Sequence, residues 1–207
     1  MKTLLVINSS GRVTRSITRH LTQRFAEAWR ARNPDGAMVL RDVGQDPPPA
    51  VNESWIAAAF ASPGERTSAM NEALRLSETL IEELATADVI VMGAPVYNFG
   101  MPAQLKAYFD QVVRVGRTFG FDANAAEHYR PLLPSRPVIV VTAAGDGAIL
   151  PGGALAHTNF LEPHLQTVLG FIGLTDVKFV RVGFDEFGGD RLKRSLAAAE
   201  VALDELA

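Results

Sequence analysis

A segment rich in hydroxyl groups follows the first apolar run of the chain. It reads Asn8-Ser9-Ser10-Gly11-Arg12-Val13-Thr14-Arg15-Ser16-Ile17-Thr18, and an amphipathic helical pattern begins at its end. The first turn of a helix has unpaired backbone N–H groups and the positive end of the helix dipole, and both attract phosphate. Arg12 and Arg15 add positive charge beside it. The segment therefore predicts a phosphate site; the alternative is that Ser16 or Thr14 only caps the helix.

A second segment displays aromatic side chains. It reads Gly93-Ala94-Pro95-Val96-Tyr97-Asn98-Phe99-Gly100-Met101-Pro102 and comes directly after another apolar run. Its prolines and glycines fix a loop at the end of a strand, where functional residues concentrate. Tyr97 and Phe99 there suit a planar, largely apolar ligand. The alternative is that both rings pack beneath the helix that follows.

A third segment is built from small residues and reads Thr142-Ala143-Ala144-Gly145-Asp146-Gly147. Two glycines let the backbone approach the edge of a ligand closely. Gly-Asp-Gly is also ordinary turn chemistry. The segment is therefore informative only together with the other two.

The sequence lacks the motifs or residue types that several other kinds of chemistry require. The chain has neither a Gly-x-Gly-x-x-Gly nor a P-loop motif, which argues against a dinucleotide held in the Rossmann manner. It has no Gly-x-Ser-x-Gly elbow for a hydrolase serine. The four histidines do not have metal-ligand spacing, so no metal site is expected. The absence of cysteine excludes thiol chemistry and disulfides.

Composition and charge narrow the class of protein. The 207 residues, 47% of them hydrophobic, are enough for one domain spanning residues 1–207. A net charge of −3 argues against nucleic-acid binding, which needs a concentrated basic face. The apolar run at residues 4–7 is too short for a signal peptide or a membrane span. We therefore expect a cytoplasmic protein with no membrane partner.

The elements that must position these segments alternate between strand and helix patterns. Five short runs rich in β-branched residues predict strands: residues 3–8, 37–40, 89–93, 138–142 and 177–182. Five stretches between and after them carry apolar residues at helical spacing: near residues 17–29, 76–84, 97–117, 160–171 and 192–206.

This alternation predicts an α/β fold, a flavodoxin-like doubly wound parallel sheet of five strands in the order 2-1-3-4-5, with helices on both faces. Ligands of such sheets bind beyond the carboxyl ends of the strands at the point where the strand order reverses. The three segments follow strands 1, 3 and 4. They should therefore meet at one edge of the sheet.

The same residues resemble the FMN-dependent NADH:azoreductase/quinone reductase family. The stretches that carry the resemblance are Ser9-Ser10 with Ser16-x-Thr18, Ala94-Pro95-Val96-Tyr97-Asn98-Phe99, Gln104-Leu105-Lys106-x-Tyr108-Phe109-Asp110 and Leu169-Gly170-Phe171-Ile172-Gly173. The resemblance spans nearly the whole chain. Its most specific part is the Ala-Pro-x-Tyr-Asn-Phe stretch.

The resemblance implies a tightly bound FMN and no catalytic side chain. FMN phosphate and ribityl contacts fall on Ser10, Ser16, Ile17 and Thr18, isoalloxazine contacts fall on Val96, Tyr97, Asn98 and Phe99, and a fourth set falls on Ala143, Ala144, Gly145 and Asp146. In the fourth set, alanines and an aspartate stand where the family usually has Ser or Thr with Gly-Gly. The family further implies a homodimer in which Phe121 and Phe171 line the substrate pocket.

The activity implied is a ping-pong transfer of hydride from NADH or NADPH, a transient co-substrate, through FMN to quinones and aromatic azo compounds. Two alternatives remain at this point. A flavodoxin-type carrier would pass single electrons to protein partners, although such carriers are typically strongly acidic and −3 is modest. A non-enzymatic binding module would use only the fold.

Overall fold

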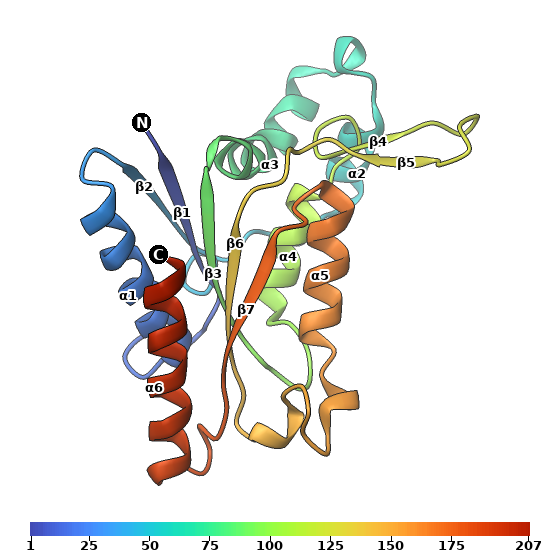
Figure 1. Ribbon diagram of the computed structural model, residues 1–207. Coiled ribbons are helices and arrows are strands. Elements are labelled where there is room, and N and C mark those ends of the chain that lie inside the picture. The colour runs from blue at the N-terminus through green and yellow to red at the C-terminus, as the bar shows by residue number, and fades with distance from the viewer.

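The computed structural model describes all of residues 1–207 and is built around a five-stranded parallel sheet with helices on both faces (Figure 1). Its strand order is β2-β1-β3-β6-β7. The strands are β1 (Thr3–Asn8), β2 (Ala37–Asp42), β3 (Val89–Pro95), β6 (Val138–Ala143) and β7 (Val177–Val182). The predicted fold class and strand order are confirmed. Three strands run one or two residues further than predicted, and their extra residues, such as Pro95 and Ala143, lie at the site edge.

Two layers of helices cover the sheet. The helices are α1 (Ile17–Arg32), α2 (Glu53–Phe60), α3 (Ser68–Thr86), α4 (Ala103–Val112), α5 (Leu161–Ile172) and α6 (Gly189–Leu206). On one face, Leu21 of α1 and Leu203 of α6 pack on Val91 and Val141 of the sheet. A larger cluster on the other face joins α3, α4 and α5 to alternate residues of the same strands. Both faces are thus buried, which explains the continuous apolar runs of the strands.

The parallel register aligns the carboxyl ends of the central strands. Asn8, the last residue of β1, lies opposite Gly93 of β3, and Pro95 lies opposite Ala143 at the end of β6. The three segments singled out in the sequence therefore leave the sheet at one edge. The predicted meeting of these segments is confirmed.

Several short elements were not predicted. Helix α2 follows a proline-rich loop, and its N-cap Asn52 accepts a hydrogen bond from the N–H of Trp55 at 3.0 Å. Strands β4 (Phe119–Phe121) and β5 (Tyr129–Pro131) form a separate antiparallel hairpin, called the hairpin below. There are also three 3₁₀ helices, η1 (Pro63–Glu65), η2 (Gly147–Ile149) and η3 (Ala156–Thr158).

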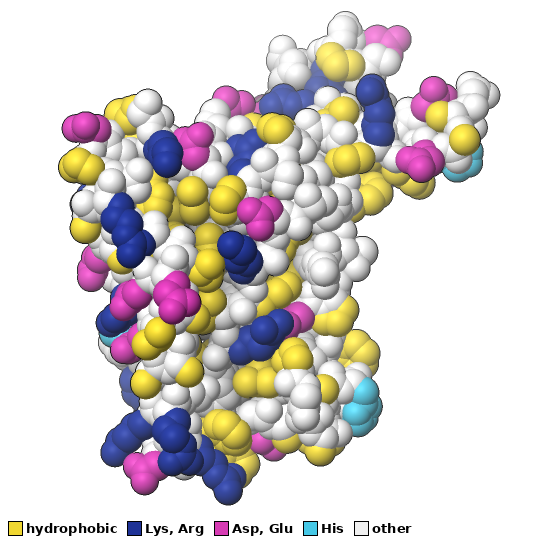
Figure 2. Space-filling model, in the orientation of Figure 1, with side chains coloured by type: hydrophobic (Ala, Val, Ile, Leu, Met, Phe, Trp, Pro, Cys, Tyr) yellow, Lys and Arg dark blue, Asp and Glu magenta, His cyan; other side chains and the backbone are white.

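The hairpin projects from the body of the molecule at the end of the sheet opposite the carboxyl ends of the strands (Figure 1). Figure 2 shows hydrophobic side chains along it. None of the helices is long and apolar enough to cross a membrane.

Candidate functional site

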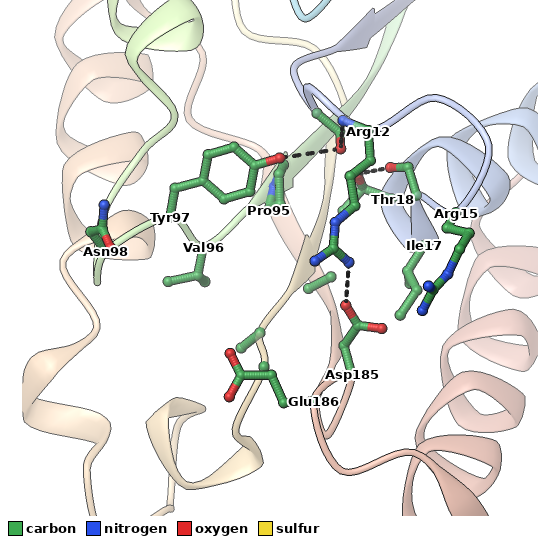
Figure 3. Close-up of a pocket in the computed structure, with 15 residues that line it drawn as sticks. Arg12, Arg15, Ile17, Thr18, Pro95, Val96, Tyr97, Asn98, Asp185 and Glu186 are labelled. Carbon is green, nitrogen blue, oxygen red and sulfur yellow. Dashed lines mark hydrogen bonds and ion pairs between the residues drawn. The ribbon is translucent and has the colours of Figure 1, made fainter.

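Two adjoining cavities lie at the carboxyl edge of the sheet. We call the one of about 410 Å³ the larger cavity of the pair (Figure 3). Ten of the twelve predicted cofactor residues line it: Ser10, Ser16, Ile17, Thr18, Val96, Tyr97, Asn98, Ala143, Ala144 and Gly145. The other two, Phe99 and Asp146, line an adjoining cavity of about 280 Å³, the smaller cavity. The two cavities share five lining residues, so they form one continuous recess.

One end of the larger cavity is the first turn of α1. Ser16 is the N-cap of this helix, and its hydroxyl accepts a hydrogen bond from the N–H of Arg19 at 3.3 Å. Its hydroxyl also lies 3.2 Å from that of Thr18. The N–H groups of Ile17 and Thr18 have no partner in the chain. Capping and anion binding are thus compatible here, because the cap leaves two helix N–H groups free.

The loop of residues 9–16, which we call the hydroxyl loop, is fixed in place by the side chain of Arg19. The Arg19 guanidinium donates to the carbonyl oxygen of Arg12 at 2.8 Å and to that of Ser10 at 2.7 Å. Gln104 of α4 donates to the carbonyl oxygen of Ser9 at 2.8 Å. These bonds fix the loop through its carbonyl groups, while Ser10 and Ser16 of the loop line the larger cavity.

The aromatic segment forms a tight turn, which we call the aromatic turn. Tyr97 and Gly100 exchange two backbone hydrogen bonds of 3.0 Å, and Asn98 and Phe99 between them have φ angles of 47° and 70°. Two positive φ angles in a two-residue loop are typical of a type I′ turn. A bulky residue such as Phe99 is strained in this conformation, and such strain concentrates at functional sites. The N–H groups of Asn98 and Phe99 have no partner in the chain.

Tyr97 connects the aromatic turn to the hydroxyl loop. Its phenol accepts a hydrogen bond from the N–H of Gly11 at 3.3 Å and lies 3.5 Å from the hydroxyl of Ser10. Figure 3 shows Tyr97 pointing toward the hydroxyl loop while Asn98 points the other way. The ring therefore spans one wall of the larger cavity, and it does not pack beneath α4.

The small-residue segment supplies the opposite wall. The N–H of Ala144 donates to the carbonyl oxygen of Val182 at 2.9 Å, whereas the N–H groups of Gly145 and Asp146 have no partner in the chain. The carboxylate of Asp146 accepts a hydrogen bond from the N–H of Ala148 at 2.9 Å and caps η2. The alanines thus leave the backbone as the source of donors in this wall.

A fourth loop, residues 183–188, completes the cavity and was not predicted. Its Asp185 accepts a hydrogen bond from Arg12 at 3.0 Å, across the mouth of the larger cavity (Figure 3). The N–H of Glu186 donates to the carbonyl oxygen of Gly145 at 3.2 Å. A Cβ atom on Gly145 would lie 2.4 Å from the Glu186 carboxyl group, so this group lies directly over Gly145. The signal in the sequence was the position of the loop, directly after the fifth strand and at the same sheet edge.

Phe121 and Phe171 do not reach either cavity of their own chain. Phe121 lies on the hairpin and Phe171 near the end of α5, at the opposite end of the molecule (Figure 1). Both belong to an aromatic cluster with Phe119 and Tyr129. The ring centroids are 4.8 Å apart for Phe119 and Phe171, 5.6 Å for Tyr129 and Phe171, and 5.3 Å for Phe121 and Tyr129. A role at the substrate pocket stays a prediction that needs a second copy of the chain.

The donors of this recess fit FMN. The free N–H groups at the start of α1 suit a phosphate, and those of the aromatic turn and of Gly145 suit the acceptor atoms along one edge of a flavin ring. The span between them is lined mainly by uncharged side chains. No group of three His, Asp or Glu side chains is placed to hold a metal ion.

Comparison with known proteins agrees with this fit. A family described by its flavodoxin-like fold matches residues 2–206. An FMN-dependent NADH:quinone oxidoreductase of Opitutus terrae is 59% identical over 204 residues, which cover 99% of this chain and 96% of that protein. An FMN-dependent NAD(P)H:quinone oxidoreductase 1 of Pseudomonas aeruginosa is 40% identical over 209 residues, which cover 100% of this chain and 99% of that protein.

Solved structures show the same fold. An azoreductase from Bacillus anthracis superposes with a TM-score of 0.88 at 20% identity and covers 100% of this chain and 98% of its own. An FMN-dependent NADH-azoreductase from the same species, in complex with FMN, gives a TM-score of 0.85 at 19% identity. The superposition covers 100% of this chain and 97% of that one. Full-length similarity to the curated relatives, on a shared fold, shows that this chain belongs to the flavodoxin-like family of FMN-dependent NADH:quinone oxidoreductases.

Proposed function

We propose that this protein is an FMN-dependent oxidoreductase that transfers two electrons from NADH or NADPH to quinones and aromatic azo compounds. One observation carries the proposal: unpaired backbone N–H groups from three loops line one continuous recess at the strand-order reversal of the sheet. The names of the relatives supply the substrate classes, since the curated proteins are quinone oxidoreductases and the structural neighbours are azoreductases.

Bound FMN would supply the hydride and electron chemistry. The chain binds and orients the cofactor. The N–H groups of Ile17 and Thr18 would hold the phosphate, and the aromatic turn would position the ring. The N–H of Gly145 would donate to the edge of the ring and would stabilise negative charge there. Tyr97 and Phe99 keep water from the ring.

The donor and acceptor use one open face of the recess in turn. This shared face is the basis of the ping-pong order that we propose. No side-chain acid or base is required, because bound FMN would supply the hydride chemistry and protons come from solvent. Apart from the carboxylates of Asp146 and Glu186, the chain presents hydrogen-bond donors and apolar walls there.

A homodimer is part of this proposal, and two exposed apolar patches support it. Phe99, Leu155 and Phe160 are between 45% and 64% exposed beside the recess, and Phe121 and Tyr129 are about half exposed on the hairpin at the other end. In a dimer with two-fold symmetry, the patch beside the recess of one copy would contact the hairpin patch of the other copy. The symmetry repeats this contact with the two copies exchanged. Phe121 of a second copy would then cover the recess, with Phe171 supporting it from behind.

The proposal treats residues 1–207 as one FMN-binding domain, and the family match over residues 2–206 supports that extent. It also keeps the expected cytoplasmic location. Both stay predictions.

An assay of NADH and NADPH oxidation tests the proposal. The protein is purified, loaded with FMN, and mixed with menadione or a neutral aromatic azo dye, and the same protein stripped of FMN is the control. We expect acceptor-dependent oxidation only from the loaded protein. Photoreduction that stops after one electron would instead indicate a carrier, and the absence of turnover with every acceptor would indicate a binding module.

A further inference from the structure

The smaller cavity differs from the larger one in charge. It is lined by uncharged residues, among them Phe99, Ile149 and Leu155, together with the carboxylates of Asp146 and Glu186. No lysine or arginine lines it. Arg12 and Arg15 line only the larger cavity, at the end where α1 begins. The end beyond the aromatic turn is therefore apolar and negatively charged.

Neither carboxylate is neutralised by a basic side chain. Asp185 of the same loop is paired with Arg12, but Glu186 has no ion pair. Asp146 has none either and accepts only the N–H of Ala148. Figure 3 shows the Glu186 carboxylate directed away from Asp185, toward Val96 and Asn98. Its charge is thus directed to the junction of the two cavities.

Basic side chains lie near the loop that carries Glu186 but do not pair with it. Lys and Arg side chains gather around the lower end of α6 (Figure 2), the helix that begins at Gly189, yet none of them forms an ion pair with Glu186 or lines the smaller cavity. The hairpin that a second copy would bring carries Asp122 and Glu127 against Arg130. A bound FMN adds its own phosphate charge at the α1 end.

From this arrangement we infer that the smaller cavity receives the electron acceptor and selects neutral and cationic aromatic acceptors over anionic ones, through Glu186 and Asp146. The inference rests on the proposed function, which it deepens by naming the charge class of the substrate. An anionic acceptor would have to approach two unpaired carboxylates in a partly dehydrated recess, where charge repulsion is stronger than in water. A neutral quinone meets no such cost.

The test compares 1,4-naphthoquinone, a naphthoquinone sulfonate and a naphthoquinone bearing a quaternary ammonium group, with the FMN-loaded full chain. The ratio of kcat/KM for the neutral over the anionic quinone is measured in wild type, Glu186→Gln and Asp146→Asn. Comparing this ratio between variants cancels the different redox potentials of the quinones. Asn keeps the cap on η2, and Gln keeps the shape of Glu186 over Gly145. Glu65→Gln, an exposed residue of η1, is the matched control.

We expect the ratio to fall about fivefold in each variant, and further in the double variant. The cationic quinone should lose rate in the same variants, and added salt should narrow the ratio in wild type more than in the double variant. Glu186→Lys should favour the sulfonate. The ratio should not change in Glu65→Gln.

An unchanged ratio in Glu186→Gln, Asp146→Asn and Glu186→Lys, with neutral quinone still reduced, would overturn the inference and leave the proposed function intact. Failure to reduce any quinone would instead count against the proposed function. Calorimetric binding of the neutral and sulfonated quinones then tests the charge preference without turnover. Equal affinity of both in wild type would overturn it.

Discussion

Arg19 of α1 donates to both carboxylate oxygens of Asp42, the last residue of β2; one of these bonds is 2.7 Å long. The same guanidinium holds two carbonyl groups of the hydroxyl loop. Asp42 therefore orients the Arg19 side chain, and Arg19 in turn holds the hydroxyl loop. Burial raises the pKa of Asp42, but the hydrogen bonds and charge of Arg19 outweigh it and hold this pKa below its ordinary value.

Replacing Asp42 by Asn should weaken both the fold and cofactor binding. The Arg19 guanidinium would lose a charged partner in a partly buried position, so we expect the free energy of unfolding at pH 7 to fall by about 1–3 kcal/mol. The FMN Kd should rise because the hydroxyl loop is less well held. Urea denaturation and flavin titration measure the two effects. Glu27→Gln, an exposed change on α1, should alter neither.

The same pair predicts a pH dependence. A carboxyl group whose pKa is lower in the folded chain contributes stability above its ordinary pKa of 3.8, and that contribution is lost as the pH falls through the folded-state value. The stabilities of wild type and Asp42→Asn should therefore converge below about pH 4. A constant difference between them from pH 7 to pH 2 would contradict this account of the pair.

Replacing Ser16 by Asp should release FMN without unfolding the protein. Asp is a good N-cap, so α1 keeps its first turn, but its charge repels the phosphate that the free N–H groups of Ile17 and Thr18 attract. We expect the FMN Kd to rise at least about tenfold. Flavin absorbance per protein after gel filtration measures this. The Ser16→Asn variant has a neutral cap and should retain the flavin. If the Ser16→Asp variant also retains it, the phosphate does not bind at the start of α1.

A mixed dimer tests whether Phe121 acts on the second copy. One chain carries Ser16→Asp and loses FMN, and the other carries Phe121→Ala and keeps it. The retained flavin then faces the intact Phe121 of the other chain. We expect kcat/KM per flavin to match wild type, whereas the Phe121→Ala homodimer should show altered acceptor preference with normal FMN content. Altered preference in the mixed dimer would place Phe121 in the site of its own chain.

The base of the hairpin depends on a buried cation. Arg114 is only 1% exposed, donates to the Ser77 hydroxyl at 2.8 Å and pairs with Glu78, which also pairs with Arg117. Burial lowers the pKa of Arg114, and Glu78 partly compensates. Glu78→Gln should therefore destabilise the protein by about 2 kcal/mol, since Glu78 is itself partly exposed.

Adding Arg114→Met to Glu78→Gln should restore part of that loss, because no unpaired cation then remains buried. Thermal unfolding of the single and double variants measures it. If the double variant is less stable than the single one, the cost lies in packing and not in the unpaired charge.

The sequence was sufficient to predict the sheet because its strands are buried on both faces. A continuous run such as Val138 to Val141 indicates a central strand without any knowledge of its neighbours. The strand order followed from fold rules, and the three segments then had to meet at one edge. As a result, ten of the twelve predicted cofactor residues line one cavity.

The missed features have local physical reasons. Strands β4 and β5 have three residues each, too few to show a period of two. Helix α2 has eight residues, and its alanines do not mark a stripe. Glu186 was missed because its importance comes from its position over Gly145, about forty residues away in the chain, and no local pattern encodes that contact.

The most direct test of the proposed activity is an anaerobic titration of the FMN-loaded protein. One equivalent of NADH or NADPH should bleach the flavin absorbance completely in a single two-electron step, and one equivalent of a neutral quinone should then restore it. Flavin that stays oxidised with both nucleotides, or reduced flavin that quinones and azo compounds do not reoxidise, would contradict the account.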